Sequence, residues 1–384
     1  MLRAFHLTVN TVFAFCMMML SLNAADFTWV SGDHWGGSHD NSALWGASWT
    51  KSWTGNVTPV NAAGNSVSIT NGWPTTNAYT DLIQLRDVIT LGTLDVDMSA
   101  SNGQFTQQTS SYYFIFDNSG NVAQINGVGT NGLKINTPVE LVSDTQFNVN
   151  NMSYLELAKG LSGNGELIIH GSNSDNNVYF NNSTYSYTGN TRIESGSLLF
   201  HQNVTIDSST NIIVNSLWDL SLTHFSSPQG YYLDPTQTLS GNGTVAMNAD
   251  IYNESRALKS GGASISPGDF NIGTLTITGA GLSLTGGNSH FEIGVSSHDQ
   301  IVTNRLYLAG SSAAGNIVIS DTGRISTGNV ALIDYSGALT GSVSDLNLVL
   351  PSGWQGTLSN NTTNTTIDLN ITKISKYGTI FIIQ

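Results

Sequence analysis

The stretch LSGNGELIIHGSNSDNNVYFNNSTYSYTGNTRIESGSLLF, residues 161–200, decides the fold class. It contains short runs of aliphatic, β-branched and aromatic residues, and Gly, Asn or Asp interrupts each run. Such runs are typical of short strands, and Asn and Gly tolerate the left-handed backbone conformation that tight corners need. The stretch therefore predicts strands of a few residues separated by sharp corners, without a helix.

The same pattern continues on both sides of this stretch. The pentapeptide LSGNG occurs at 161–165 and again at 239–243, each time just before a further strand-like run. Leu275 and Ile277 alternate with polar residues, and the alternation resumes after a glycine-containing corner. A period of two means one buried and one solvated face. Repeated units of strand and corner indicate stacked coils, each burying its aliphatic row against the next.

Among all-β folds, the parallel β-helix fits best. A sandwich or barrel would need longer strands and more hairpin signals, and a propeller would need an aromatic signature repeated at about 40–50 residues. We therefore expect an all-β chain folded as a right-handed parallel β-helix, a solenoid. Coils of roughly 20–25 residues rising about 4.8 Å would make about 15 coils and a rod of about 70 Å. Near the end, SNNTTNTTIDLN (359–370) predicts a Thr/Asn ladder on stacked strands.

The start of the chain reads as a secretory signal peptide. Arg3 and His6 precede an apolar run too short to span a bilayer, and small residues follow it. The single cysteine, Cys16, lies in that run, so the exported chain would carry no thiol. The expected organisation is a signal peptide (1–25), a Trp-rich N-terminal cap (26–75), the β-helix (76–372) and a C-terminal strand or tail (373–384).

The composition limits the kinds of partner. The formal net charge is −14, yet only 10% of residues are charged, so Ser, Thr, Asn and Gly must supply most of the surface. With 12 Lys and Arg residues in total, binding to nucleic acid is not expected. No segment after the start is apolar for long enough to suggest an integral membrane span.

From about residue 161 onward the chain resembles the passenger regions of bacterial autotransporters and the related β-strand-repeat surface proteins. The resemblance rests on 161–200, on the second LSGNG, and on a Ser-Pro-Gly corner that precedes GTLTI. Trp29, Trp53 and Pro59 match the opening of such proteins. The resemblance implies a β-helix, secretion and exposure at a bacterial outer surface. The shared motifs are structural, so they imply no reaction.

The Trp-rich stretch FTWVSGDHWGGSHDNSALWGASWTKSW (27–53) is the most site-like segment. Trp35, Trp45 and Trp49 could stack on sugar rings as a carbohydrate platform. Alternatively, they cover the core that the first coil of a solenoid leaves exposed. We favour the capping interpretation and keep the carbohydrate site as its alternative.

The same stretch holds a candidate metal site. Asp33, His34, His39 and Asp40 are ligand types for Zn²⁺ or Ca²⁺, although the two histidines lie five residues apart in a Gly-rich loop without a fixed face. A metal site also needs a supporting second layer of hydrogen bonds. We therefore expect no cofactor, with Ca²⁺ or Zn²⁺ left open at these four residues.

Two further sets of titratable residues lie on predicted strands. Asp95 and Asp97 alternate onto one face, where a polysaccharide lyase would gather carboxylates beside a Lys or Arg base. His290 and Glu292 also share a face, and His298 and Asp299 follow, which could supply half of a metal site. In both sets the favoured interpretation is an ordinary solvent-facing or structural residue.

The expected function is that of an exported, non-enzymatic surface or extracellular protein with a structural or adhesin-like display role. Its expected partners are extracellular glycans or other cell-surface components. The alternative is a carbohydrate-binding or polysaccharide-cleaving β-helix protein. A smooth Asn/Ser/Thr face would favour the first function, whereas acids and aromatics stacked on one sheet would favour the second.

Overall fold

The computed structural model describes residues 26–28, 42–45, 62–69, 82–85, 87–99, 102–107, 109–181, 183–201, 203–221, 230–248, 253–269, 271–308, 315–323 and 325–375. Within them, short strands follow one another and form two long sheets and two short ones. Two three-residue 3₁₀ helices, η2 (Glu254–Arg256) and η3 (Val343–Asp345), interrupt the strands. No helix in the described residues is long and apolar enough to span a membrane.

The first long sheet, sheet 1, has 13 strands that all pair in parallel. In spatial order they are β1 (Asp26–Thr28), β3 (Ser66–Ile69), β6 (Thr93–Asp97), β9 (Ala123–Val128), β12 (Thr145–Asn148), β15 (Leu167–His170), β17 (Thr191–Ile193), β19 (Asn211–Val214), β21 (Thr238–Gly241), β24 (Ser264–Pro267), β27 (Asn288–Ile293), β30 (Gly315–Asp321) and β33 (Leu346–Val349).

The second long sheet, sheet 2, has 14 strands. In spatial order they are β2 (Ser42–Trp45), β4 (Leu82–Leu85), β7 (Gly103–Gln107), β10 (Leu133–Asn136), β13 (Tyr154–Leu157), β16 (Asn177–Phe180), β18 (Ser197–Phe200), β20 (Leu217–Asp219), β22 (Thr244–Ala246), β25 (Thr274–Thr278), β28 (Gln300–Thr303), β31 (Gly328–Tyr335), β35 (Thr366–Ile374) and β34 (Trp354–Asn361). Only the last two pairings, β31 with β35 and β35 with β34, are antiparallel.

Two four-stranded parallel sheets form a third side of the coils. One contains β14 (Leu161–Gly163), β11 (Val139–Leu141), β8 (Phe114–Phe116) and β5 (Ile89–Leu91). The other contains β23 (Leu258–Lys259), β26 (Leu282–Leu284), β29 (Leu306–Leu308) and β32 (Leu339–Thr340).

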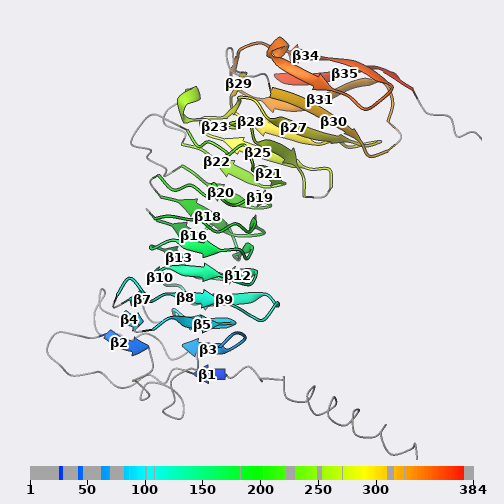
Figure 1. Cartoon of the computed structure of the whole chain (residues 1–384). Coiled ribbons are helices and arrows are strands. Elements are labelled where there is room, and N and C mark those ends of the chain that lie inside the picture. The colour runs from blue at the N-terminus through cyan, green and yellow to red at the C-terminus, as the bar shows by residue number, and fades with distance from the viewer. Residues whose placement is uncertain are drawn as a thin grey trace, which may run out of the picture.

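Successive strands therefore take turns among the sheets, and each turn of the chain adds one coil to a long stack (Figure 1). The coil length can be read from the register, since Ala123 pairs with Thr145 and Thr145 with Leu167, a repeat of 22 residues. Strands spaced about 4.8 Å apart make the 13 strands of sheet 1 a stack of about 60 Å. These features confirm the expected all-β parallel β-helix.

The core runs along the inside of the stack. Burial alternates along most strands, so that one row of aliphatic or aromatic side chains per sheet points inward. Aromatic rings stack from coil to coil in the middle of the rod: the Phe180 and Phe200 ring centroids are 5.4 Å apart, and Trp218 meets Phe200 edge-on at 5.6 Å. All three side chains are fully buried. This continuous column is what each coil buries against the next.

The two LSGNG copies serve the same backbone purpose at different corners. The first three residues of the first copy form β14 in a short sheet, whereas those of the second copy form the end of β21 in sheet 1. In both, the central glycine has a positive φ, +101° for Gly163 and +116° for Gly241. A Cβ atom there would lie 2.1 Å from a carbonyl oxygen of the preceding coil, that of Leu141 or Val214. The repeat therefore marks a tight corner, not a fixed place in the coil.

The expected Thr/Asn ladder at 359–370 is wrong, because this segment forms a hairpin. Strand β34 turns through residues 362–365 and returns antiparallel as β35. Its polar residues make the turn, where Thr365 has φ +56°, while Ile367 and Leu369 are fully buried. The apolar alternation of β35 therefore covers the last coil of sheet 2 and ends the parallel stack.

The segment predicted as an N-terminal cap, 26–75, supplies the first strands of both long sheets. Strands β1 and β3 begin sheet 1 and β2 begins sheet 2. The parallel sheets thus begin before residue 76. Figure 1 shows these strands, in blue, at one end of the stack, opposite the hairpin of β34 and β35.

Candidate functional site

The predicted sugar and metal residues fall in the Trp-rich segment. The backbone of Trp45 ends β2 and pairs with Leu85. The Trp45 side chain lies outside the described part of the structure, and so do the other predicted site residues in full, namely Asp33, His34, Trp35, His39, Asp40 and Trp49. The carbohydrate platform and the Zn²⁺ or Ca²⁺ site at these positions therefore stay predictions.

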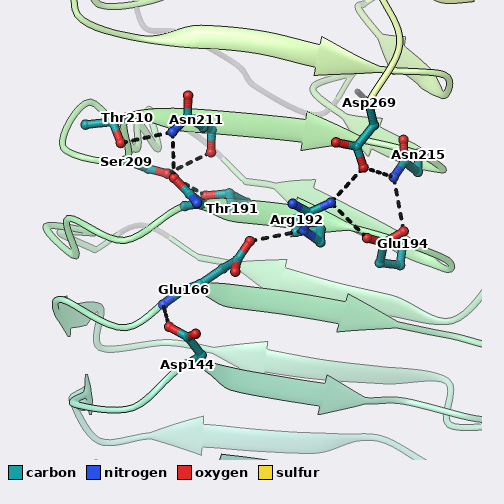
Figure 2. Close-up of polar contacts among 11 residues, drawn as sticks. Asp144, Glu166, Thr191, Arg192, Glu194, Ser209, Thr210, Asn211, Asn215 and Asp269 are labelled. Atoms are coloured by element: carbon teal, nitrogen blue, oxygen red, sulfur yellow. Dashed lines mark hydrogen bonds and ion pairs between the residues drawn. The ribbon is translucent and has the colours of Figure 1, made fainter. Parts of the chain in front are cut away.

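A network of charged side chains, here called the Arg192 network, lies on the outer face of sheet 1 (Figure 2). The Arg192 guanidinium contacts three carboxylates: Nε lies 3.1 Å from Glu166 Oε1, and Nη1 lies 3.2 Å from Glu194 Oε1 and 2.7 Å from Asp269 Oδ2. Asn215 Nδ2 donates to Glu194 Oε2 at 3.0 Å and to Asp269 Oδ2 at 3.2 Å. The network thus connects several coils.

Strand alternation and one sharp corner position these groups. Arg192 lies in β17 and Glu194 directly follows this strand; because they are two residues apart, both side chains lie on the outer face of the sheet. Asp269 follows a Ser-Pro-Gly corner in which Gly268, at φ +87°, exchanges two backbone hydrogen bonds with Gly241 at 2.8 and 2.9 Å. The corner turns the chain back along sheet 1, and Asp269 thereby reaches an arginine 77 residues earlier in the sequence.

The electrostatics of the Arg192 network oppose catalysis by its arginine. Burial alone would lower the pKa of Arg192, but the hydrogen bonds that it donates to Glu166 and Glu194 and the charge of Asp269 together raise it. A lyase base must lose its proton near neutral pH, so a raised pKa is the wrong direction. The guanidinium also occupies the centre of the three carboxylates, where a cation would have to bind. The arrangement can hold coils together, but it is not suited to proton abstraction.

A second polar arrangement on sheet 1 explains the predicted Asp95 and Asp97. Asn126 Nδ2 donates to Asp95 Oδ1 at 2.7 Å, and Asn148 Nδ2 donates to Asn126 Oδ1 at 2.6 Å. The three residues occupy equivalent positions in successive coils. Asp97 shares the outer face with Asp95, but its Oδ1 accepts the backbone N–H of Ser99 at 2.9 Å. One acid therefore belongs to an amide row and the other to a turn.

Of the predicted residues around Asp299, Glu292 contacts it only through its backbone N–H, and Asp299 clamps a corner. Asp299 is fully buried, and its two oxygens accept the backbone N–H groups of Gly273 at 2.8 Å and Glu292 at 2.7 Å. Burial raises the pKa of Asp299 to about 6, although both hydrogen bonds act in the opposite direction. Burial also lowers the pKa of His290. Nowhere in the described ranges do three or more His, Cys, Asp or Glu side chains form a group that could hold a metal ion.

Sequence reasoning did not find the Arg192 network or a cluster of rings on sheet 2. Alternation in TRIES does place Arg192 and Glu194 together, but Asp269 comes from a corner whose path no local pattern reveals. The cluster on sheet 2 contains Tyr154 and Tyr179, whose rings lie edge to face. Their outward direction follows from strand alternation, but their neighbours depend on the coil register.

Comparison with known proteins adds no relative. A scan against known protein families finds no match, and a search of the curated proteins finds no similar sequence. The function must therefore be argued from the geometry of the described residues.

Proposed function

We propose that this protein is an exported, non-enzymatic β-helical rod that acts outside the cell or at a bacterial cell surface, in a structural or adhesin-like display role. The observation that carries the proposal is the way in which polar groups on the outer face of sheet 1 satisfy one another. Arg192 is held by three carboxylates, and Asp95, Asn126 and Asn148 are hydrogen-bonded in a row. Such a face stabilises a rod and leaves few groups free for chemistry.

Two pKa shifts on these coils also support a structural role. The pKa of Arg192 is raised by its ion pairs, and the Asp299 carboxylate is occupied by two backbone N–H groups. Catalytic groups need a pKa near the working pH and access to substrate. Asp299 has the suitable pKa, but its side chain is fully buried.

The exported part of the proposal is supported by residues 1–25, whose basic start, short apolar run and small residues are typical of a signal peptide. The test is to produce the full chain with a C-terminal tag in a Gram-negative host, fractionate the cells and determine the N-terminus of the recovered protein. The recovered protein should lack about its first 25 residues. It should be found outside the cytoplasm, or be detected by an antibody on intact cells. An unprocessed cytoplasmic protein would contradict the proposal.

The non-enzymatic part has its own assay. Purified protein is incubated with neutral and acidic polysaccharides, and new reducing ends and unsaturated products are measured. The wild type should form no more product than the Arg192→Met variant, because the raised pKa of Arg192 excludes this residue as a base. Turnover by the wild type that Arg192→Met abolishes, while its circular dichroism is unchanged, would establish a lyase or hydrolase instead.

The second candidate function is carbohydrate binding without cleavage. One specific observation favours it, namely the outward-facing aromatic and acidic side chains on sheet 2. Extracellular glycans are the partners that such a surface would meet.

A further inference from the structure

We propose that the outer face of sheet 2 binds an uncharged glycan across three successive coils, through Tyr154, Tyr179 and His201. These three residues are here called the ring strip. The inference rests on the proposed exported rod only for its setting, since binding itself can be tested with purified protein. None of its residues belongs to the Trp-rich segment at the start of the chain.

The ring strip crosses the coils diagonally. Tyr154 begins β13, Tyr179 lies in β16, and His201 directly follows β18. The Tyr154 and Tyr179 ring centroids are 5.9 Å apart and nearly perpendicular, and the Tyr179 and His201 centroids are 5.4 Å apart at 33°. Each side chain is partly exposed. Three rings thus follow one another along the rod, one from each of three successive coils.

The core does not require these rings. The inward positions of the same strands carry Leu155, Val178 and Leu198, which are almost completely buried. Tyr154 and Tyr179 lie on the opposite, outer face of sheet 2. On sheet 1, the outward positions carry Asn and Gln instead. A ring that is half apolar and carries a hydroxyl suits a ligand with both apolar and polar surface, such as a sugar.

Polar groups beside the rings are already oriented. Glu156 stands opposite Tyr179 in the strand register. Its Oε1 accepts Lys134 Nζ at 2.8 Å and Asn181 Nδ2 at 2.7 Å, so the carboxylate is fixed. Within the described residues no hydrogen bond uses Glu156 Oε2, which leaves an acceptor for a sugar hydroxyl.

The tyrosine hydroxyls complete the set of donors. Neither the Tyr154 nor the Tyr179 hydroxyl makes a hydrogen bond to another described residue. Burial raises the pKa of both, and the charge of Glu156 raises that of Tyr154 further. Both hydroxyls therefore remain protonated donors at neutral pH. Rings, two free hydroxyls and one held carboxylate match the alternating apolar faces and hydroxyl edges of a sugar chain.

Charge decides which glycans fit. The protein carries a formal net charge of −14, and Lys134 beside the ring strip is neutralised by Glu156 at 2.8 Å. An acidic polysaccharide would be repelled by this charge. The structure therefore points to neutral hexose chains.

The experiment measures binding by native affinity electrophoresis in gels that contain soluble β-glucan, mannan, galactan or polygalacturonate. The wild type should be retarded by at least one of the neutral polysaccharides but not by polygalacturonate. Tyr179→Ala should weaken that binding about tenfold or more, the effect of removing a central stacking ring. Tyr232→Ala is the matched control, since Tyr232 is 47% exposed and lies outside the ring strip.

Two further variants keep the result decisive if Tyr179→Ala fails to fold. Tyr179→Phe keeps the ring and should retain most of the binding, whereas His201→Ala removes the last ring and should weaken it. Absence of retardation by every neutral polysaccharide would overturn the inference, and so would retardation that Tyr179→Ala and His201→Ala leave unchanged while Trp45→Ala abolishes it. These outcomes leave the export assay untouched, so failure of the inference and failure of the proposed function are distinguishable.

Discussion

At Gly241 the backbone passes so close to the preceding coil that no side chain fits. The residue has φ +116°, and a Cβ atom would lie 2.1 Å from the Val214 carbonyl oxygen. Gly120 has φ +86° with nothing within 4 Å of its Cβ position. A side chain at Gly120 would therefore meet only the cost of the positive φ, whereas a side chain at Gly241 would meet that cost and a backbone clash.

Gly241→Ala should therefore lower the free energy of unfolding more than Gly120→Ala does. The positive φ is expected to cost each variant about 1–2 kcal/mol, and the clash should add about 1 kcal/mol or more at Gly241 through a forced backbone shift. Urea unfolding followed by circular dichroism measures both values. Equal losses in the two variants would show that contact with Val214 does not constrain this corner.

Asp299 is a residue whose protonation should alter stability. Its folded-state pKa of about 6 lies above the ordinary value of 3.8, so the folded protein binds this proton more tightly than the unfolded chain. The resulting stabilisation is complete below about pH 3.8 and is lost as the pH rises through 6. From pH 7 to pH 5, the contribution of Asp299 to the free energy of unfolding should increase by about 1 kcal/mol.

The measurement compares urea unfolding at pH 5, 6 and 7 for the wild type and Asp299→Asn. The variant will be less stable throughout, because an amide offers one acceptor oxygen to the N–H groups of Gly273 and Glu292. The informative quantity is the change in the free energy of unfolding between pH 7 and pH 5, which should be about 1 kcal/mol smaller in the variant. Parallel slopes would assign the pH dependence to other groups.

At the scale of elements, the sequence predicted those strands whose pattern is local. Leu275 and Ile277 are fully buried in β25, as their alternation with polar residues indicates. The hairpin at 359–370 was missed because repeated Asn and Thr suit both a ladder and a turn. What distinguishes them is the apolar row of β35, which needs the last coil as its partner.

In the candidate site, too, the local strand pattern was predictable, whereas the contacts between coils were not. Asp95 and Asp97 were correctly placed on one face, but their separate partners depend on which residues lie one coil away. Asp269 was beyond prediction, because it reaches Arg192 across 77 residues through a corner at Gly268. Sequence patterns describe a strand's faces, whereas the contacts between coils depend on corner lengths.

The Ser-Pro-Gly corner at the end of β24 should be coupled to β17 through the ion pair of Asp269 with Arg192. Arg192 and Asp269 side chains are 20% and 17% exposed, with Nη1 and Oδ2 2.7 Å apart. A double-mutant cycle of Arg192→Met and Asp269→Asn should give a coupling energy of about 1 kcal/mol, which decreases as salt screens the pair. The control cycle uses Lys134→Met and Glu156→Gln, whose lysine is 33% exposed, and should give a smaller coupling. Zero coupling for the first pair would mean that the corner folds independently of β17.

For the whole molecule, a stack of coils means that stability is nearly a sum of coils and of contacts between neighbours. Between residues 123 and 167 the coil length is constant, since Leu133 pairs with Leu155 and Val139 with Leu161, again 22 residues apart. A coil in this region is therefore a unit that the chain can lose. Excision of residues 123–144 would join Val122 directly to Thr145, the residue that occupies the position of Ala123 in the next coil.

The variant lacking 123–144 should fold into a rod shorter by about 4.8 Å, and remain stable because every retained strand meets an equivalent partner. Asn148, for example, would face Asp95 in place of Asn126. Deletion of 123–133 removes half as many residues but places β10 in the position of a sheet 1 strand, so it should unfold or aggregate. Small-angle scattering gives the length, and urea unfolding gives the stability. If the shorter deletion proved the better tolerated, the amount of chain removed would matter more than register, and the coil would not be the unit of this fold.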